Sequence, residues 1–349
     1  MKGAADMAGY NERRRGERGQ VLVLVALGMV ALVAMVGLVL DGGSTFGQRR
    51  AEQRGADLAA LAGANDLLLH GNAASAEAVA KSVATQNGYD PAVVTVDVTI
   101  TTFSAAGGKV QVDITAPHQN SFSTIVGFNK WDVSVKAAAV AGYVTGGTGI
   151  GPIIFSVNDF LANGDPKPEY SETGCPTAPG GGGDPGCPFG TVNGDAPAAG
   201  GHDIAWSDYG GPNVDSDEVK DIIRGEGVIS TEPTLNQYIG QHNGGFHSSV
   251  FDTVEEYLVG LDILVPVTTE QVPGIPDGPD SCGDLGGAPA GGGCFQGWAV
   301  FHVTSVDKHN KLIYGYFVTG TFATGGRVDD CISDCPRSFG NNYAIYLSE

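Results

Sequence analysis

The sequence predicts an α+β protein in which an N-terminal transmembrane helix runs into a helix packed on an antiparallel sheet, followed by a loop-rich, disulfide-stapled mixed α/β domain. Three observations support this fold class. An uncharged apolar run covers residues 21–40, hydrophobic side chains alternate in two runs between residues 94 and 115, and six cysteines lie among Gly-rich segments after residue 152.

Length and charge narrow the class of protein. The chain has 349 residues, enough for about two folded units, and 54 of them are glycine, which predicts folded segments joined by long loops. Lys and Arg number 19 against 39 Asp and Glu, a formal net charge of −20. We therefore expect no nucleic-acid partner, because neutralising phosphates requires a basic surface.

Residues 21–40 are predicted to form a single membrane-spanning helix. An α-helix of this length covers about 30 Å, the thickness of the hydrocarbon core of a bilayer. A cleaved secretory signal is the alternative, but its apolar stretch is usually shorter and ends at a small-x-small site, whereas this run leads into Asp41-Gly42-Gly43. Arginines before the run predict that residues 1–20 are cytoplasmic and the rest extracytoplasmic: Arg13, Arg14, Arg15 and Arg18.

Residues 41–142 are predicted to form a small α+β module that begins with a break at Asp41-Gly42-Gly43. Its apolar spacing changes from a helical period to strict alternation after Pro91. The expected elements are helices over residues 44–69 and 75–86, strands over 94–101 and 110–115, a short helical or looped insert over 121–127 and a strand over 131–141. The first helix would pack on the apolar face of the strands.

Residues 143–151 contain several glycines and no charge, which predicts a flexible linker between two domains. Residues 152–349 would then form an extracytoplasmic C-terminal domain. Its expected elements are helices over 217–224, 234–239 and 248–258, and strands over 153–157, 261–267, 297–306, 311–322 and 342–347. The last of these strands is expected to close the sheet of this C-terminal domain.

All six cysteines follow the predicted span, as expected of a chain whose C-terminal part faces an oxidising compartment. They fall into three clusters, which favour disulfides between neighbours: Cys175 with Cys187, Cys282 with Cys294, and Cys331 with Cys335. Each bridge would close a local loop, the first two of them Gly-rich. The alternative is a zinc site made of the third cluster and another pair.

The sequence predicts no catalytic residue and no cofactor. Nucleophile-elbow, zinc-protease and phosphate-loop signatures are absent. The pair His242 and His247 lacks further ligands and is interpreted as part of a loop. Four acidic residues are calcium candidates, but their place at the start of a predicted helix is already explained by the helix dipole: Asp215, Asp217, Glu218 and Asp221.

One segment carries a specific resemblance. Arg18-Gly19, the uncharged span, Asp41-Gly42-Gly43, Arg49-Arg50 with Gln53, and the run from Ala56 to Ala62 resemble the N-terminal segment of TadG-like proteins of the tight-adherence (Flp) pilus assembly system. The likeness extends over residues 15–142, with departures at Glu52, Gly55 and Leu58. It implies a pilin-like module and a pilus-related role. Cleavage by a prepilin peptidase would require a Glu at the fifth position after Gly19, and the sequence has none there.

Two functions remain open. The resemblance implies a non-enzymatic, membrane-anchored component of pilus assembly, pseudopilin-like or minor pilin-like, that contributes to surface adhesion and has pilin or other assembly proteins as partners. The lipid bilayer is a further partner, and the membrane helix could mediate homo-oligomers. The alternative is an anchored cell-surface hydrolase or carbohydrate-binding protein, with its activity in residues 152–349. Such an enzyme would require convergent side chains, among them His202, His242, His247 and His302.

Overall fold

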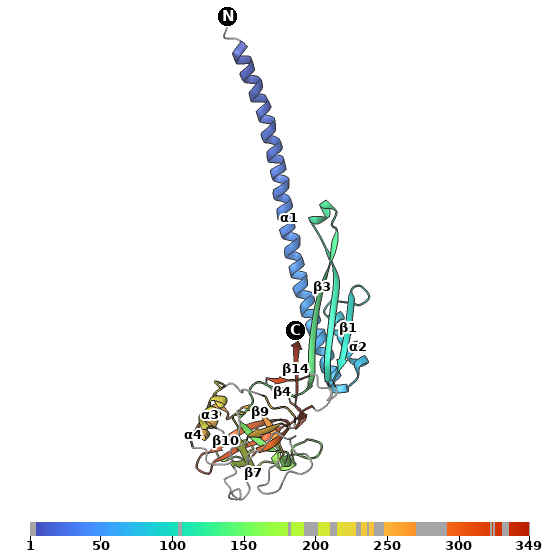
Figure 1. Ribbon diagram of the computed structural model, residues 1–349. Helices are drawn as coiled ribbons and strands as arrows, with labels where there is room; N and C mark the ends of the chain where they lie inside the picture. Colours follow the sequence, from blue (N-terminus) through green and yellow to red (C-terminus); the bar gives the residue numbers. More distant parts are fainter. Residues whose placement is uncertain are drawn as a thin grey trace.

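The computed structural model describes most of the chain. The described residues are 5–103, 107–180, 183–191, 202–209, 215–227, 232–235, 237–240, 248–269, 292–321, 323, 325–329 and 335–348. The molecule is elongated, with a long helix that leads from the N-terminus to a sheet and then to a second, rounder body at the opposite end (Figure 1).

Helix α1 runs without interruption from Ala5 to His70. The predicted break at Asp41-Gly42-Gly43 is therefore wrong. No proline interrupts the helix, and two glycines cost only about 1 kcal/mol each relative to alanine. The stretch from Val21 to Leu40 is exposed except at Gly37. Its mean hydropathy and length fit a membrane anchor.

The second half of α1 packs on helix α2 (Ala73–Gln86) and on a four-stranded antiparallel sheet of order β1-β2-β3-β14. Strands β1 (Thr95–Thr102), β2 (Gly107–Gln119) and β3 (Lys130–Tyr143) follow the predicted alternation. Alternate side chains of β2, namely Val110, Val112 and Ile114, pack against the helices and are fully buried. The helix surfaces facing them consist mainly of alanine, which lets backbones approach closely: Ala56, Ala59, Ala60, Ala64, Ala76, Ala80 and Ala84.

The fourth strand of this sheet comes from the end of the chain. Strand β14 (Tyr343–Ser348) lies antiparallel to β3, with Ile345 opposite Ala141. The expectation that this strand closes the C-terminal sheet is wrong, because its backbone pairs with the open edge of β3 instead. In Figure 1 it extends from the second body back along the N-terminal sheet.

Residues 143–151 also differ from the prediction of a flexible linker. Strand β4 (Gly146–Gly147) pairs with β12 (Gly326–Arg327), and Val144 and Thr145 are buried. The indole Nε1 of Trp298 donates a hydrogen bond of 2.7 Å to the carbonyl oxygen of Thr145. The segment is therefore part of a core that joins the two bodies rather than a free tether.

The second body is built on a ring of six strands. Consecutive pairings run β11-β6-β7-β5-β9-β10, and β10 pairs again with β11, which closes a barrel. The strands are β5 (Ile153–Ser156), β6 (Cys187–Thr191), β7 (His202–Trp206), β9 (Asp262–Thr268), β10 (Gly292–Asp307) and β11 (Leu312–Val318). Aromatic side chains fill its core, with Phe155, Phe189, Phe301 and Phe317 in edge or tilted contact.

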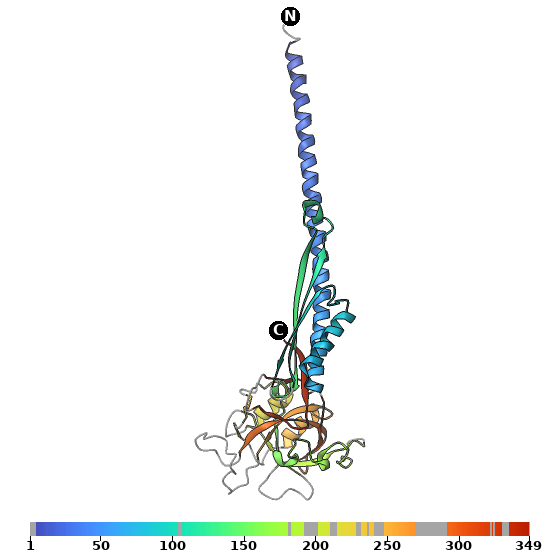
Figure 2. The ribbon, with the colours of Figure 1, turned by 90° about the vertical axis from the view of Figure 1, so that its right-hand side faces the viewer.

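Two helices and several short elements complete the second body, which lies at the end of the molecule away from the N-terminus (Figure 2). Helix α3 (Ser216–Arg224) is capped by Asp215 at its N-terminus and by Gly225 at its C-terminus, and α4 (Ser248–Tyr257) packs beside it. Short elements are η2 (Val157–Asp159), η3 (Pro168–Tyr170), β8 (Tyr238–Gly240) and β13 (Arg337–Ser338). The helix predicted over residues 234–239 is wrong, since residues 238–240 pair with β10 as a strand.

Candidate functional site: the hairpin tip on the apolar helix

The strongest polar cluster at the end of the apolar stretch centres on Asp41 of α1, a carboxylate that is only 2% exposed. It accepts hydrogen bonds from the backbone N–H groups of Ser121 at 2.9 Å, Phe122 at 3.1 Å and Ser123 at 2.6 Å. The hydroxyl of Ser123 donates a fourth, of 2.7 Å. One side chain thus fastens the tip of the β2–β3 hairpin to the helix.

The hairpin reaches this carboxylate because β2 and β3 are long. They extend along α1 beyond the packed core, and their connection folds into the short helix η1 (Ser123–Val126) (Figures 1 and 2). The residue before η1 is Phe122, whose side chain cannot cap it. Asp41 supplies the missing acceptor, since a carboxylate satisfies free N–H groups at a helix start.

These contacts favour the ionised form of Asp41. Burial opposes ionisation, but the hydrogen bonds from Ser123, Ser121 and Phe122 outweigh it and lower the pKa of Asp41 from 3.8 to about 2. Asp41 therefore carries a negative charge at neutral pH, directly beyond the apolar stretch.

A glycine lets the tip approach the helix. A Cβ atom at Gly37 would lie 2.6 Å from the Cβ of Phe122, closer than carbon atoms can pack. Toward the N-terminus, the tip and α1 enclose an open, apolar groove of about 480 Å³. It is lined by Met29, Val30, Val33, Ala34, Leu38, Phe122, Ser123 and Ile125.

A polar seam continues from Asp41 down the packed side of α1. His118 of β2 lies between Ser44 and Gln48, and its ring stacks on Trp131 of β3. The indole Nε1 of Trp131 donates to Thr45 at 3.1 Å. These contacts hold both strands of the hairpin against the helix.

The seam ends at Glu52, which is fully buried. Its Oε1 accepts a hydrogen bond of 2.7 Å from Gln48, whereas Oε2 has no partner. Burial raises the pKa of Glu52 above its usual value of 4.5, although the Gln48 contact and the charge of His118 act against this shift. Glu52 is also a position where the chain departs from the TadG-like pattern.

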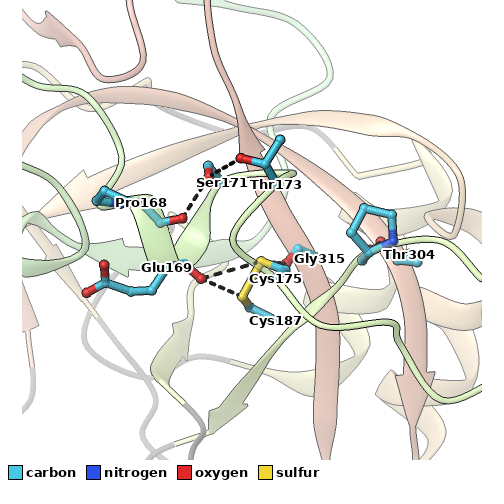
Figure 3. Close-up of a disulfide and its surroundings, with 9 residues drawn as sticks. Pro168, Glu169, Ser171, Thr173, Cys175, Cys187, Thr304 and Gly315 are labelled. Carbon is cyan, nitrogen blue, oxygen red and sulfur yellow. Dashed lines mark hydrogen bonds between the residues drawn. A yellow bond between two sulfur atoms is a disulfide. The ribbon is translucent and has the colours of Figure 1, made fainter.

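The predicted cysteine positions lie in the second body. Cys175 and Cys187 form a disulfide, the neighbour pair that their spacing favours, and the bridge joins a loop to β6 (Figure 3). Around it, Ser171 donates to the carbonyl oxygen of Pro168 at 2.7 Å. Cys294 and Cys335 are disulfide-bonded as well. Their predicted partners, Cys282 and Cys331, lie outside the described residues.

Of the four candidate histidines, only His302 has a described side chain. His302 of β10 contacts Asp262 through Nδ1 at 2.6 Å and stacks on Tyr316, both from neighbouring strands. His202 belongs to β7, but its side chain is outside the described residues, as are His242 and His247. Among the described residues, no group of three or more His, Cys, Asp or Glu could hold a metal.

The acidic candidates of α3 have local partners. Asp215 caps the helix by accepting from the N–H of Asp217, Asp217 pairs with Lys220, and Asp221 pairs with Arg224. Glu218 shares a hydrogen bond with Asp208, which raises the pKa of Glu218 above 4.5. Each of these four carboxyl groups therefore has a polar partner within the protein.

The sequence predicts a helix break at Asp41 and an insert over residues 121–127, but it does not indicate that the two are in contact. The signal that could have linked them is the charge-free apolar segment from Ser121 to Phe128, which is unusual at the tip of a hairpin. No pattern in the sequence near Gly37 or Phe122 predicts that these two residues pack against each other.

Fold and site together define a class: a protein with one long apolar helix that continues into a helix-on-sheet module and holds a hairpin against its own apolar stretch. Residues 19–66 match the family model described as "Putative Flp pilus-assembly TadE/G-like", so this segment of the chain is TadE/G-like. The match covers Asp41 and ends near the C-terminus of α1. No curated protein and no solved structure matches the chain.

Proposed function

We propose that the chain is a non-enzymatic, membrane-anchored component of Flp-type pilus assembly, pseudopilin-like or minor pilin-like, that contributes to surface adhesion. The observation that carries the proposal is the TadE/G-like match over residues 19–66. It coincides with the part of α1 that passes from the apolar stretch into the packed module. In this proposal residues 1–20 are cytoplasmic and the remainder is extracytoplasmic.

The arrangement of the two bodies supports this role. A helix that leaves the membrane and packs on an antiparallel sheet is the architecture of a pilin-like subunit, and the barrel lies at the end of the molecule away from the N-terminus (Figure 1). A barrel in that place projects from the membrane surface, where pilin or other assembly proteins are accessible. The disulfide at Cys175 and Cys187 suits an oxidising exterior.

The test is to delete the encoding gene, image pili by electron microscopy and restore the gene with variants. We expect loss of piliation and adhesion, recovery with the wild-type chain, and co-purification of pilin or assembly proteins. Leu32→Arg should not restore piliation, because a charge at mid-bilayer costs at least about 2.5 kcal/mol on insertion scales. Phe46→Arg is the matched control, since Phe46 is 69% exposed on α1 beyond the apolar stretch.

Normal piliation in the deletion strain would refute the proposal. Hydrolytic or sugar-binding activity of the purified chain, with piliation unchanged, would favour the anchored enzyme or carbohydrate-binding protein instead.

A further inference from the structure

We propose that the hairpin tip, residues 121–128, is a second membrane segment that inserts into the hydrocarbon of the leaflet in which the apolar stretch of α1 ends. The inference rests on the proposed function in one respect: it takes residues 21–40 to span a bilayer. It then assigns lipid acyl chains as the occupant of the groove between the tip and α1.

The depth of the tip follows from the helix that it touches. Phe122 packs at Gly37, and the groove between tip and helix is lined by residues from Met29 to Leu38. With a rise of about 1.5 Å per residue, Gly37 lies about 5 Å and Met29 about 16 Å inside the end of the span at Leu40. A span that includes these residues places the tip among acyl chains.

The side chains of the tip suit that environment. Phe122, Ile125 and Phe128 are 38%, 79% and 65% exposed, and no charged residue occurs between Asn120 and Asn129. Large apolar side chains gathered at an exposed turn are unfavourable in water. In the bilayer they extend the apolar surface of the helix beside them.

Six backbone N–H groups of the tip have hydrogen-bond partners within the protein. Non-helical backbone is tolerated at membrane depth only where its polar groups are satisfied by protein. Asp41 accepts hydrogen bonds from three of these N–H groups. Three more donate to carbonyl oxygens within the turn: Ile125 N–H to Phe122 at 3.0 Å, Gly127 N–H to Thr124 at 3.1 Å and Phe128 N–H to Ser123 at 3.0 Å. The hydroxyl of Thr124 donates to the oxygen of Asn120 at 2.7 Å.

The residues that follow the tip are of the types found at the boundary between the hydrocarbon and the lipid headgroups. Lys130 is exposed at the start of β3, and Trp131 comes next, level with Thr45 through its indole hydrogen bond. Thr45 is five residues beyond Leu40, which corresponds to about 7 Å past the end of the span. Trp and Lys at this level are typical of residues that contact lipid headgroups.

The occupant can be identified by photo-crosslinking of the full chain in native membranes. The photoreactive residue p-benzoylphenylalanine is introduced singly at three positions: Ile125 in the tip, Leu32 in the span and Thr101 on β1. Thr101 is exposed and belongs to the same sheet, so it serves as the matched control. Adducts are identified by mass spectrometry as phospholipid or protein.

We expect phospholipid adducts at positions 125 and 32 and none at 101. A phospholipid adduct at 32 without one at 125 would overturn the insertion of the tip and leave the span intact. A protein adduct at 125, from pilin or a second copy, would also overturn it, because protein rather than acyl chains would then occupy the groove. Loss of lipid adducts at 32 would instead refute the membrane span on which the proposed function depends.

Discussion

The carboxylate of Asp41 and the backbone N–H of Ser123 lie 2.6 Å apart, although 82 residues separate them in the chain. This contact joins the end of the apolar stretch to the far end of the β2–β3 hairpin. Because the same carboxylate also binds the Ser123 hydroxyl and two further N–H groups, the tip depends on one side chain.

Replacing that side chain is expected to free the tip. Asp41→Asn keeps the shape but removes the charge and replaces one acceptor oxygen with an amino group. We expect faster hydrogen exchange at the amides of Ser121, Phe122 and Ser123, measured by mass spectrometry, with the strand amides below them unchanged. Asp97→Asn, at an exposed position of β1, is the control and should leave these rates unaltered.

The attachment of the tip should also depend on pH. The pKa of Asp41 is lowered from 3.8 to about 2 in the folded chain, so the unfolded state binds more protons between these values. The stabilisation is present above pH 3.8 and is lost as the pH falls toward 2. Exchange at the Ser123 amide, corrected for its intrinsic pH dependence, should accelerate in this window. A flat corrected rate would contradict the assignment.

Glu52 should behave in the opposite sense. Because its pKa is raised above 4.5 in the folded state, the folded chain holds the proton more tightly, and stability falls as the pH rises above 4.5. Glu52→Gln removes the buried charge and should raise the free energy of unfolding by on the order of 1 kcal/mol at pH 7, but hardly at pH 4. Thermal unfolding of the detergent-solubilised chain at both pH values checks this.

The control for Glu52→Gln is Glu77→Gln on α2. That carboxylate is solvent-accessible and pairs with Lys81 on the helix surface, where ion pairs contribute little. An equal gain from both variants would show that burial is not the cause.

Two glycines of α1 should respond to alanine in opposite directions. At Gly55 a Cβ would lie 2.5 Å from the ring of Tyr89, so Gly55→Ala should destabilise the module by about 1–3 kcal/mol through overpacking. Gly47 has nothing within 4 Å, and Gly47→Ala should stabilise the helix by about 0.5–1 kcal/mol. Denaturant unfolding of both variants compares them directly.

Removal of β14 should affect both bodies. A chain ending at Asn342 loses the strand that pairs with residues 138–143 of β3. It also loses the side chain of Ala344, which packs in the same core cluster as Val140 of β3 and Trp298 of the barrel. We expect faster amide exchange along β3 and a red-shifted tryptophan emission. Unchanged exchange in β3 would mean that the sheet is stable with three strands.

The local elements were largely predictable from the sequence. The end of α2 at Asn87-Gly88 and the boundaries of α3, between Asp215 and Gly225, follow from residues that cap helices wherever they occur. The alternating hairpin places Val98 opposite Val112, as the period of two requires. The apolar run, too, is recognisable from side-chain chemistry alone.

Long-range partners were decided only by the tertiary structure. The sequence indicates a strand over residues 343–348, but any unpaired strand edge offers the same backbone hydrogen bonds, so the sequence does not specify β3 as the partner. Asp41-Gly42-Gly43 has the composition of a helix break, yet the helix continues through it. The carboxylate of Asp41 accepts hydrogen bonds from backbone N–H groups that lie 80 or more residues later in the chain. Local propensity is worth about 1 kcal/mol per residue, and contacts formed on folding override it.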